Sequence, residues 1–225
     1  MTERKKAILS EFGLLMTAII WGSAFVVVKN TTETLPVNYI ICVRFLIAAF
    51  LIGAIFWKHL KKLNKTYWKN GIILGLFLYI SFYLQTLGVK YTTAGKNAFL
   101  TAIYVVLVPF LYWIVKKKKT DNYNLIAAFF CIIGIGLISL NQDFTVNFGD
   151  LHSLLCGVAF CAQIVAVSIF TEKQDPILLS FLQFLVAGIF GLLGTVMFET
   201  LPSQIETEAI LGLLYIGVFS SAIAF

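Results

Sequence analysis

Aromatic, hydroxyl and amide side chains recur at helical spacing inside long apolar stretches of this sequence. Asn97, Thr101 and Tyr104 follow one another at steps of four and three residues, which places them on one face of a helix. Tyr79 and Tyr83 lie four residues apart in an earlier stretch. Aromatic rings with a few hydrogen-bonding groups suit a cavity for a small amphipathic solute. The residues that we expect to contact such a solute are Trp21, Ser23, Tyr79, Tyr83, Asn97, Thr101, Tyr104 and Gln163.

The same side chains also have a purely structural interpretation. Tyrosine and tryptophan are common in helix packing and at membrane interfaces, so packing competes with solute contact at each aromatic position. A glutamine in an apolar stretch can instead hydrogen-bond a neighbouring helix, which is worth about 1 kcal/mol. Both roles remain open for Gln163.

Three polar residues carry a charge or an amide into apolar surroundings. Arg44 lies inside the second apolar stretch, where a cation needs a partner, a cluster of carbonyls or water. No apolar stretch offers it a clear acidic partner, so a gating or structural role is favoured over solute binding. Lys96 lies in the first turn of its stretch, where it either serves function or extends its ammonium group toward water. We therefore group Arg44, Lys96 and Gln183 as gating or structural polar residues.

These residues do not make a catalytic or metal site. Ser23 has no histidine in the middle of an apolar stretch to act as its base, and no pair of carboxylates occurs there. The cysteines form no CxxC pair and have no histidine at ligand spacing, and they are Cys42, Cys131, Cys156 and Cys161. We expect no enzyme, no metal and no cofactor.

The composition is that of a membrane protein. Of the 225 residues, 60% are hydrophobic and 12% are charged, whereas a soluble domain has about 45–50% and about 25%. The net charge of +6 does not indicate a nucleic-acid partner, because the basic residues lie in short connections between apolar stretches. A spanning helix needs about 20 apolar residues. Eight stretches come close, at Ser10–Val28, Val37–Trp57, Gly71–Val89, Ala94–Val115, Leu125–Leu140, Leu151–Phe170, Ile177–Phe198 and Ala209–Phe225.

The basic residues alternate between the two ends of these stretches. They precede the first stretch and gather in the connections after the second, fourth and sixth, for example at Lys61, at residues 116–119 and at Lys173. The opposite connections hold few, among them Lys29 and Lys90. Because basic connections stay in the cytoplasm, the pattern predicts a multi-pass protein of the cell membrane with a cytoplasmic N-terminus.

Two stretches recur later in the same order. The segment ICVRFLIAAFLIG from Ile41 aligns with SFLQFLVAGIFGL from Ser180, and ILGLFLY from Ile73 aligns with ILGLLY from Ile210. A repeat of five spans is odd in number, so its second copy crosses the membrane in the opposite direction. The sequence predicts an all-α polytopic transmembrane helix bundle with inverted-topology five-helix repeats. The first repeat covers 10–141, and an incomplete second repeat covers 149–225.

The pattern resembles the drug/metabolite transporter (DMT) superfamily and, within it, the ten-helix EamA-like transporter family. The resemblance covers the first half throughout and three spans of the second half. It implies that the chain is truncated after the eighth of ten expected transmembrane helices. The matching motifs are Trp21-Gly22-Ser23, Arg44-Phe45, the block from Lys90 to Gly95 running into Asn97-Ala98-Phe99-Leu100, Pro109, and Gly134-Ile135-Gly136.

The resemblance implies a secondary membrane transporter of the bacterial inner membrane. Such a protein moves small metabolites, amino acids or drug-like solutes by alternating access, as export or facilitated exchange. Its partners would be the solute, the lipid bilayer and either a second copy or a separate partner half. Proton coupling usually needs an ionisable carboxylate or histidine in the membrane, and these stretches hold neither away from their ends, which favours a facilitator or exchanger. The alternatives are an inactive or partner-dependent truncated transporter fragment and a channel, although no ring of charges favours a channel.

Overall fold

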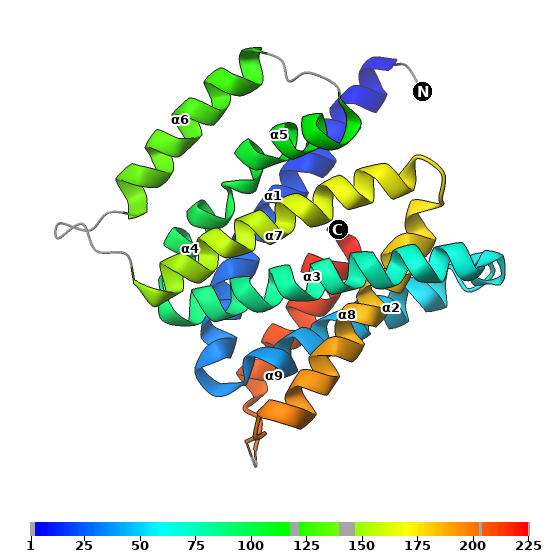
Figure 1. Cartoon of the computed structure of the whole chain (residues 1–225). Coiled ribbons are helices and arrows are strands. Elements are labelled where there is room, and N and C mark those ends of the chain that lie inside the picture. The colour runs from blue at the N-terminus through cyan, green and yellow to red at the C-terminus, as the bar shows by residue number, and fades with distance from the viewer. Residues whose placement is uncertain (1–2, 118–121, 140–146, 203, 225) are drawn as a thin grey trace.

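The computed structural model describes residues 3–117, 122–139, 147–202 and 204–224, and every regular element in these ranges is helical. Figure 1 shows the helices along the chain. Two of them differ from an α-helix: η1 is a short 3₁₀-helix and η2 is a π-helix. The bounds are Glu3–Thr34 (α1), Val37–Ile55 (α2), His59–Lys62 (η1), Lys65–Tyr91 (α3), Ala94–Thr101 (α4), Tyr104–Lys116 (α5), Asn122–Ser139 (α6), Phe148–Thr171 (α7), Pro176–Phe198 (α8), Thr207–Tyr215 (α9) and Ile216–Ile223 (η2).

The described residues form an all-α helix bundle built to cross a membrane, as the sequence predicts. By length and composition, 6 segments within these described ranges qualify as spans: Ser10–Thr34, Val37–Ile55, Lys65–Tyr91, Ala94–Lys116, Phe148–Thr171 and Pro176–Phe198. The predicted fifth stretch corresponds to α6, and the predicted eighth corresponds to the shorter apolar pair α9 and η2. Some predicted positions lie outside the described residues. They are the stretch ends at Leu140 and Phe225, the end of the first repeat at 141, and the basic residues Lys118 and Lys119.

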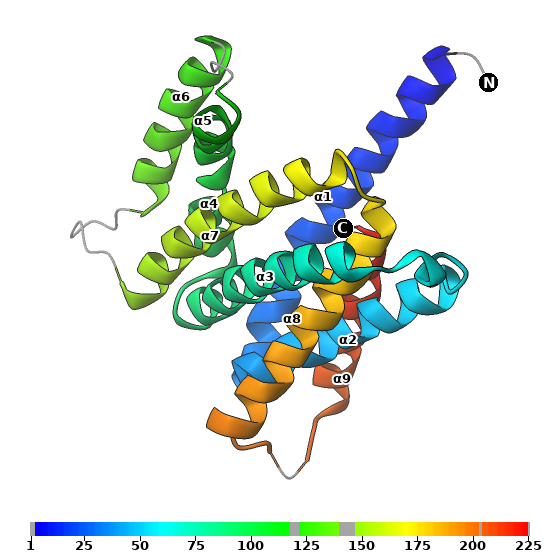
Figure 2. The same cartoon turned by 45° about the vertical axis from the view of Figure 1, so that its right-hand side comes forward.

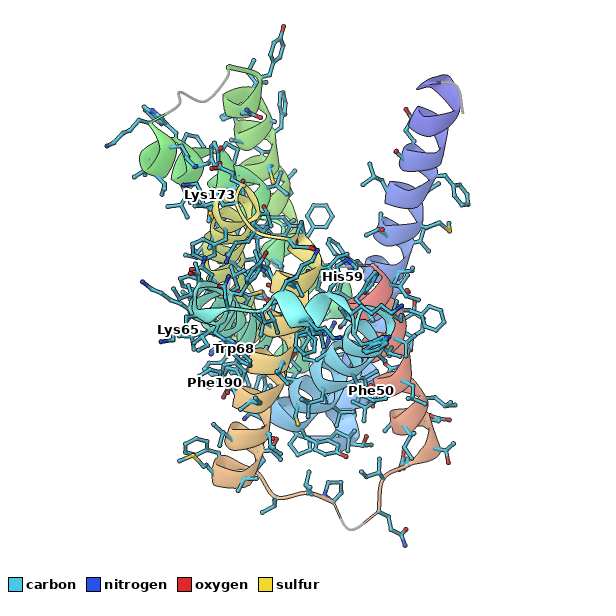
Figure 3. The ribbon with its side chains drawn as sticks, turned by 90° about the vertical axis from the view of Figure 1, so that its right-hand side faces the viewer. Phe50, His59, Lys65, Trp68, Lys173 and Phe190 are labelled. Carbon is cyan, nitrogen blue, oxygen red and sulfur yellow. The ribbon has the colours of Figure 1, made fainter. Side chains whose placement is uncertain are left out.

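The outer surface of the bundle is apolar. Phe50 is 74% exposed, Leu137 is 77% exposed and Val196 is 76% exposed. Figure 3 shows Phe50 and Trp68 on the outside of the helices. An apolar surface of this extent is the surface that a bilayer requires.

The centre of the bundle is made by α2, α3, α7 and α8. Helix α3 lies along both α7 and α8, and α2 lies along α8 (Figures 1 and 2). The rings of Phe45 on α2 and Phe184 on α8 stack with centroids 5.5 Å apart. A Cβ atom on Gly191 would lie 2.7 Å from the backbone nitrogen of Cys42, so only glycine permits this approach of α8 to α2.

Polar side chains cap the starts of α3 and α4. Asn64 accepts hydrogen bonds from the backbone N–H groups of Thr66 and Tyr67 at the start of α3. Thr93 Oγ1 accepts one from the backbone N–H of Lys96 at the start of α4. These caps satisfy backbone donors that the first helical turn leaves without a partner.

The connections between helices lie at opposite sides of the bundle. In Figure 1 the α2–α3 and α7–α8 connections lie at the right, whereas the α1–α2, α3–α4 and α8–α9 connections lie at the lower left. Figure 3 looks onto the first side and shows His59, Lys65 and Lys173 there. The arrangement agrees with a chain that crosses the membrane back and forth.

The predicted fourth span is not one continuous helix. Helix α4 ends at Thr101, and α5 begins at Tyr104 after a turn at Ala102 and Ile103. The Ile103 side chain lies against Gly157 of α7, where an added Cβ would also approach the Thr101 carbonyl oxygen to 2.9 Å. The row predicted as one helix face is therefore divided between α4 and α5.

Candidate functional site

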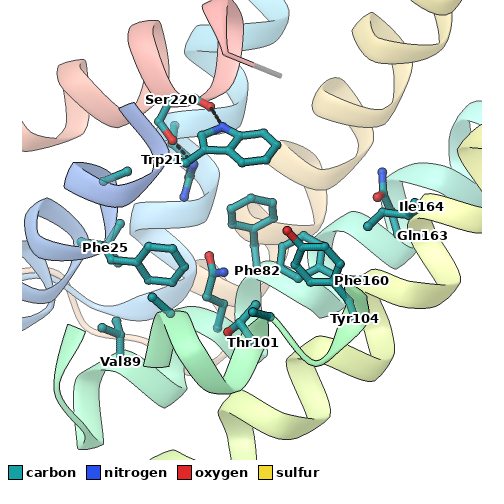
Figure 4. A pocket seen from close by; sticks show the side chains of 16 residues that line it. Trp21, Phe25, Phe82, Val89, Thr101, Tyr104, Phe160, Gln163, Ile164 and Ser220 are labelled. Atoms are coloured by element: carbon teal, nitrogen blue, oxygen red, sulfur yellow. Dashed lines mark hydrogen bonds between the residues drawn. The ribbon is translucent and has the colours of Figure 1, made fainter. Parts of the chain in front are cut away.

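A cavity of about 210 Å³ lies among the helices, near the middle of the chain's spans. It is mainly apolar, and the rings of Trp21, Phe25, Phe82, Tyr104 and Phe160 form part of its wall (Figure 4). Its lining comes from seven elements, namely α1, α2, α3, α4, α5, α7 and η2. The lining residues are Trp21, Ala24, Phe25, Val28, Arg44, Phe82, Gln85, Val89, Ala98, Thr101, Ala102, Tyr104, Phe160, Gln163, Ile164 and Ser220.

The aromatic wall is held by ring contacts. Phe82 meets Phe160 edge to face with centroids 5.1 Å apart, and Tyr104 meets Phe160 at 6.1 Å. The Trp21 indole N–H donates to the backbone carbonyl of Ser220 at 3.3 Å, a bond drawn in Figure 4. The rings thus meet the cavity from fixed positions, which suits stacking against an apolar solute.

The interruption between α4 and α5 lies at the cavity wall. Thr101, Ala102 and Tyr104 all line it, from the end of one helix, the turn and the start of the next. Solute sites in membrane transporters are typically formed by helices broken in this manner.

Arg44 is the one cationic side chain among the described residues that line the cavity, and it is 2% exposed. Its Nε and Nη2 atoms donate to Ser221 Oγ at 3.1 and 3.0 Å, and Nη2 donates to Ser220 Oγ at 3.3 Å. Its Cζ atom lies 4.4 Å from the ring centroid of Phe82. Two hydroxyl groups and aromatic rings therefore surround Arg44 in place of an acidic partner, which the apolar stretches do not offer.

The two predicted glutamines form a pair. Gln163 Nε2 donates to Gln183 Oε1 at 3.1 Å, which joins α7 to α8. Only Gln163 lines the cavity. The structure therefore gives Gln183 an interhelical contact, and it gives Gln163 both that contact and a place at the wall.

Four of the predicted solute-contacting residues line this cavity, namely Trp21, Thr101, Tyr104 and Gln163. Two of the others are bonded elsewhere. The Ser23 hydroxyl lies 2.7 Å from the Tyr215 hydroxyl. The Tyr79 hydroxyl donates to Asn38 Oδ1 at 2.8 Å.

Asn97 and Tyr83 lie close to the cavity without lining it. Asn97 is fully buried, and its Nδ2 donates to Ser153 Oγ at 2.6 Å, which ties α4 to α7. Tyr83 lines a second, more open cavity of about 540 Å³ together with Lys90 and Glu199. Solute contact by these residues stays a prediction.

Lys96 belongs to a buried ion pair. Its Nζ lies 2.6 Å from Oδ2 of Asp150, whose side chain is fully buried, and Thr92 Oγ1 donates to the other oxygen at 2.9 Å. Asp150 Oδ2 also accepts the backbone N–H of Asn147 at the start of α7. This pair fastens the start of α4 to the start of α7, in keeping with a structural role for Lys96.

Several lining residues were not predicted from the sequence. Phe82 and Val89 are two turns apart on α3, so helical spacing also places them on a shared face, as it does Tyr79 and Tyr83. No pattern in the sequence around Phe160 or Ser220 identifies these residues as part of a cavity. The described residues contain no group of three or more His, Cys, Asp or Glu side chains that could hold a metal ion.

Comparison with known proteins gives a family match over nearly the whole chain. The model of the EamA-like transporter family matches residues 8–140 and 147–225. An uncharacterized transporter of Archaeoglobus fulgidus is 31% identical over 99% of this chain and 69% of its own length. The uncharacterized transporters YoaV and YetK of Bacillus subtilis are 24% and 25% identical, over 95% and 98% of this chain and 76% and 71% of their own lengths.

A solved structure shows the same fold. A crystal structure matches with a TM-score of 0.68 at 15% sequence identity, over 95% of this chain and 75% of that one. At this identity the likeness concerns the fold alone.

Proposed function

Because the chain belongs to the EamA-like transporter family, a family of membrane transporters, we propose that it moves small amphipathic solutes across the cytoplasmic membrane. The solutes are small metabolites, amino acids or drug-like compounds. The mechanism is alternating access, and the process is export or facilitated exchange. The residues that contact the solute are those that line the aromatic cavity.

One observation carries the proposal. The cavity is lined from both matched segments, because Trp21, Phe82 and Tyr104 come from the first and Phe160 and Ser220 from the second. It also lies at the interruption of α4 and α5. A site between two repeats, beside a broken helix, is the arrangement found in many secondary transporters.

We further propose that the two matched segments are inverted repeats. The alignment of the second and seventh spans pairs Phe45 with Phe184, and these two rings stack at 5.5 Å across the α2–α8 contact. Equivalent residues that touch each other support a pseudo-two-fold axis between the segments. The basic connections on one side support a cytoplasmic N-terminus.

Solute counterflow tests the function. Proteoliposomes containing the full chain are preloaded with unlabelled L-phenylalanine, phenylacetate or uridine, and uptake of the same labelled solute is measured. A carrier gives saturable uptake that internal solute stimulates for at least one of them. Uptake without saturation indicates a channel, and no stimulated uptake of any of these solutes contradicts the proposal.

A matched pair of variants connects transport with the cavity. Phe82→Leu removes a ring from the cavity wall, whereas Phe50→Leu removes one from the lipid-facing surface. We expect several-fold slower counterflow for Phe82→Leu and an unchanged rate for Phe50→Leu, because aromatic contacts with the solute are lost in the first variant only. Equal rates would place the transport path elsewhere.

A further inference from the structure

The charge of Arg44 is not balanced by any described carboxylate. The ion pairs between described residues that the structure contains join Lys96 to Asp150 and Lys116 to Glu172. Within the described part of the chain, the Arg44 guanidinium group donates to the neutral hydroxyls of Ser220 and Ser221 and lies over the rings of Phe45 and Phe82. A buried cation without a counter-charge is costly, and the cost falls when an anion arrives.

Part of the Arg44 guanidinium group remains available for a ligand. The hydrogen bonds to Ser220 and Ser221 use Nε and Nη2, and none of them uses Nη1. Among the described residues, the side-chain atoms that are fully buried and lack a hydrogen-bond partner are Thr86 Oγ1 and Asn97 Oδ1. Nη1 of Arg44 is not one of them, so it is not fully buried. Arg44 is also one of the residues that line the cavity.

The side chain is held ready for such a contact. Ser220 and Ser221 are consecutive residues of the π-helix η2, and both hydroxyls accept from the guanidinium group. The Phe82 ring supports its Cζ atom at 4.4 Å. Because neutral groups fix its position, the cation keeps its full charge for a partner in the cavity.

We propose that Arg44 forms an anion subsite of this cavity and that the solute is a small organic monocarboxylate with an apolar body. The inference rests on the proposed transport function and narrows its substrate class. A guanidinium group matches the planar, two-oxygen geometry of a carboxylate. The other described lining residues are neutral, which favours one negative charge over the multiple charges of a phosphate ester.

The apolar body has its own place. Trp21, Phe25 and Phe160 stand around the cavity that Arg44 also lines (Figure 4). A ring or short alkyl group contacts these side chains while the carboxylate reaches Nη1 of Arg44. An amine in the same place would face the arginine charge and be repelled.

Equilibrium binding to the full chain tests the subsite. The protein is placed in nanodiscs of phosphatidylcholine, which lack anionic lipid, and labelled phenylacetate is titrated against it. Phenylacetamide and phenethylamine, which keep the ring and replace the carboxylate, serve as competitors. We expect phenylacetate to bind about tenfold or more tightly than either of them, because only the acid gains a charge-assisted hydrogen bond. Equal competition by the amide overturns the inference.

Variants then assign the effect to Arg44. Arg44→Gln should weaken phenylacetate binding about tenfold or more. Arg44→Lys should weaken binding less, because lysine keeps the positive charge but lacks the planar guanidinium group that can donate to both carboxylate oxygens. Lys62→Gln removes an equal charge from an exposed position and should leave binding unchanged. Unchanged binding in Arg44→Gln contradicts the inference. If Arg44→Gln does not fold, the acid and amide comparison on the unaltered chain decides.

The result separates the two proposals. Arg44-dependent binding of phenylacetate without stimulated counterflow of any solute would retain the subsite and refute transport. Stimulated counterflow together with equal binding of acid and amide would retain transport and refute the subsite.

Discussion

The rings of Phe45 and Phe184 stack with centroids 5.5 Å apart and planes 11° apart. These residues occupy matching positions in the two similar stretches, and each lies on a helix at the centre of the bundle, Phe45 on α2 and Phe184 on α8. Phe45 also meets Phe82 edge to face at 4.9 Å, and Phe82 lines the cavity. The contact between the segments and the wall of the cavity are therefore parts of one aromatic cluster.

The approach of α8 to α2 predicts a sensitive glycine. Gly191→Ala places a Cβ atom 2.7 Å from the backbone nitrogen of Cys42, and a backbone atom cannot move aside as a side chain can. We expect a loss of about 1–3 kcal/mol in stability, seen as a lower melting temperature of the purified protein in detergent. Gly13→Ala, with nothing within 4 Å of its added Cβ, is the control and should melt unchanged or slightly higher.

The glutamine pair separates a structural role from a solute role. Gln163→Leu and Gln183→Leu each break the same 3.1 Å hydrogen bond, but only Gln163 lines the cavity. Both variants should lower the melting temperature by similar amounts, since each loses about 1 kcal/mol. Only Gln163→Leu should raise the KM of counterflow. Equal KM values would show that the amide serves helix packing alone.

The buried ion pair should be worth more than an exposed one. Asp150→Asn leaves the Lys96 ammonium, with its side chain 10% exposed, without its carboxylate. We expect a loss of about 3–5 kcal/mol, because a buried charge loses its partner. In Lys116→Gln, which breaks an exposed pair with Glu172, we expect a loss of about 0–1 kcal/mol.

A double variant completes this test. Replacing both partners, as Lys96→Met with Asp150→Asn, removes the unpaired charge and should recover part of the stability lost in Asp150→Asn. Losses that simply add in the double variant would mean that Lys96 and Asp150 are not coupled.

Glu199 caps a helix that has no cap of its own. Its Oε1 accepts the backbone N–H of Asn38 at 2.8 Å, and its Oε2 accepts that of Tyr39 at 3.1 Å. Pro36, at the start of α2, supplies no side-chain acceptor. Glu199→Gln should lose about 1–2 kcal/mol in thermal denaturation, because one charged acceptor becomes an amide. The exposed Glu206→Gln should have little effect.

The membrane orientation can be read by cysteine labelling. In intact cells, a membrane-impermeant maleimide should label Glu206→Cys, in the α8–α9 connection, and should not label Lys62→Cys in the α2–α3 connection. After the cells are opened, both should react. The reverse pattern of labelling would place the N-terminus outside and refute the orientation taken from the basic residues.

The helices were predictable because apolar length and capping residues are local signals. Thr93 at the start of α4 is such a case. The interruption after Thr101 was not predictable, because Ala102 and Ile103 are ordinary helix residues. The turn depends on the packing of Ile103 against Gly157, which lies far along the chain. Local spacing cannot report a contact of that kind.

The site was predictable in part for the same reason. Spacing along the predicted fourth span identified Thr101 and Tyr104, which line the cavity. On α3, however, spacing favoured the face of Tyr79 over the adjacent face of Phe82. The partners of Arg44 lie 176 and 177 residues away, at Ser220 and Ser221. No pattern around Arg44 points to them, so only the folded chain reveals what holds this cation.

The π-helix from Ile216 to Ile223 has an evolutionary consequence. A π-helix places an extra residue in each turn compared with an α-helix, and here it presents two successive serines to Arg44. Deletion of a single residue within it would favour an ordinary α-helix and rotate Ser220 and Ser221 by about 100° relative to the preceding helix. Natural variants should therefore tolerate many exchanges of side chains in this segment but very few insertions or deletions.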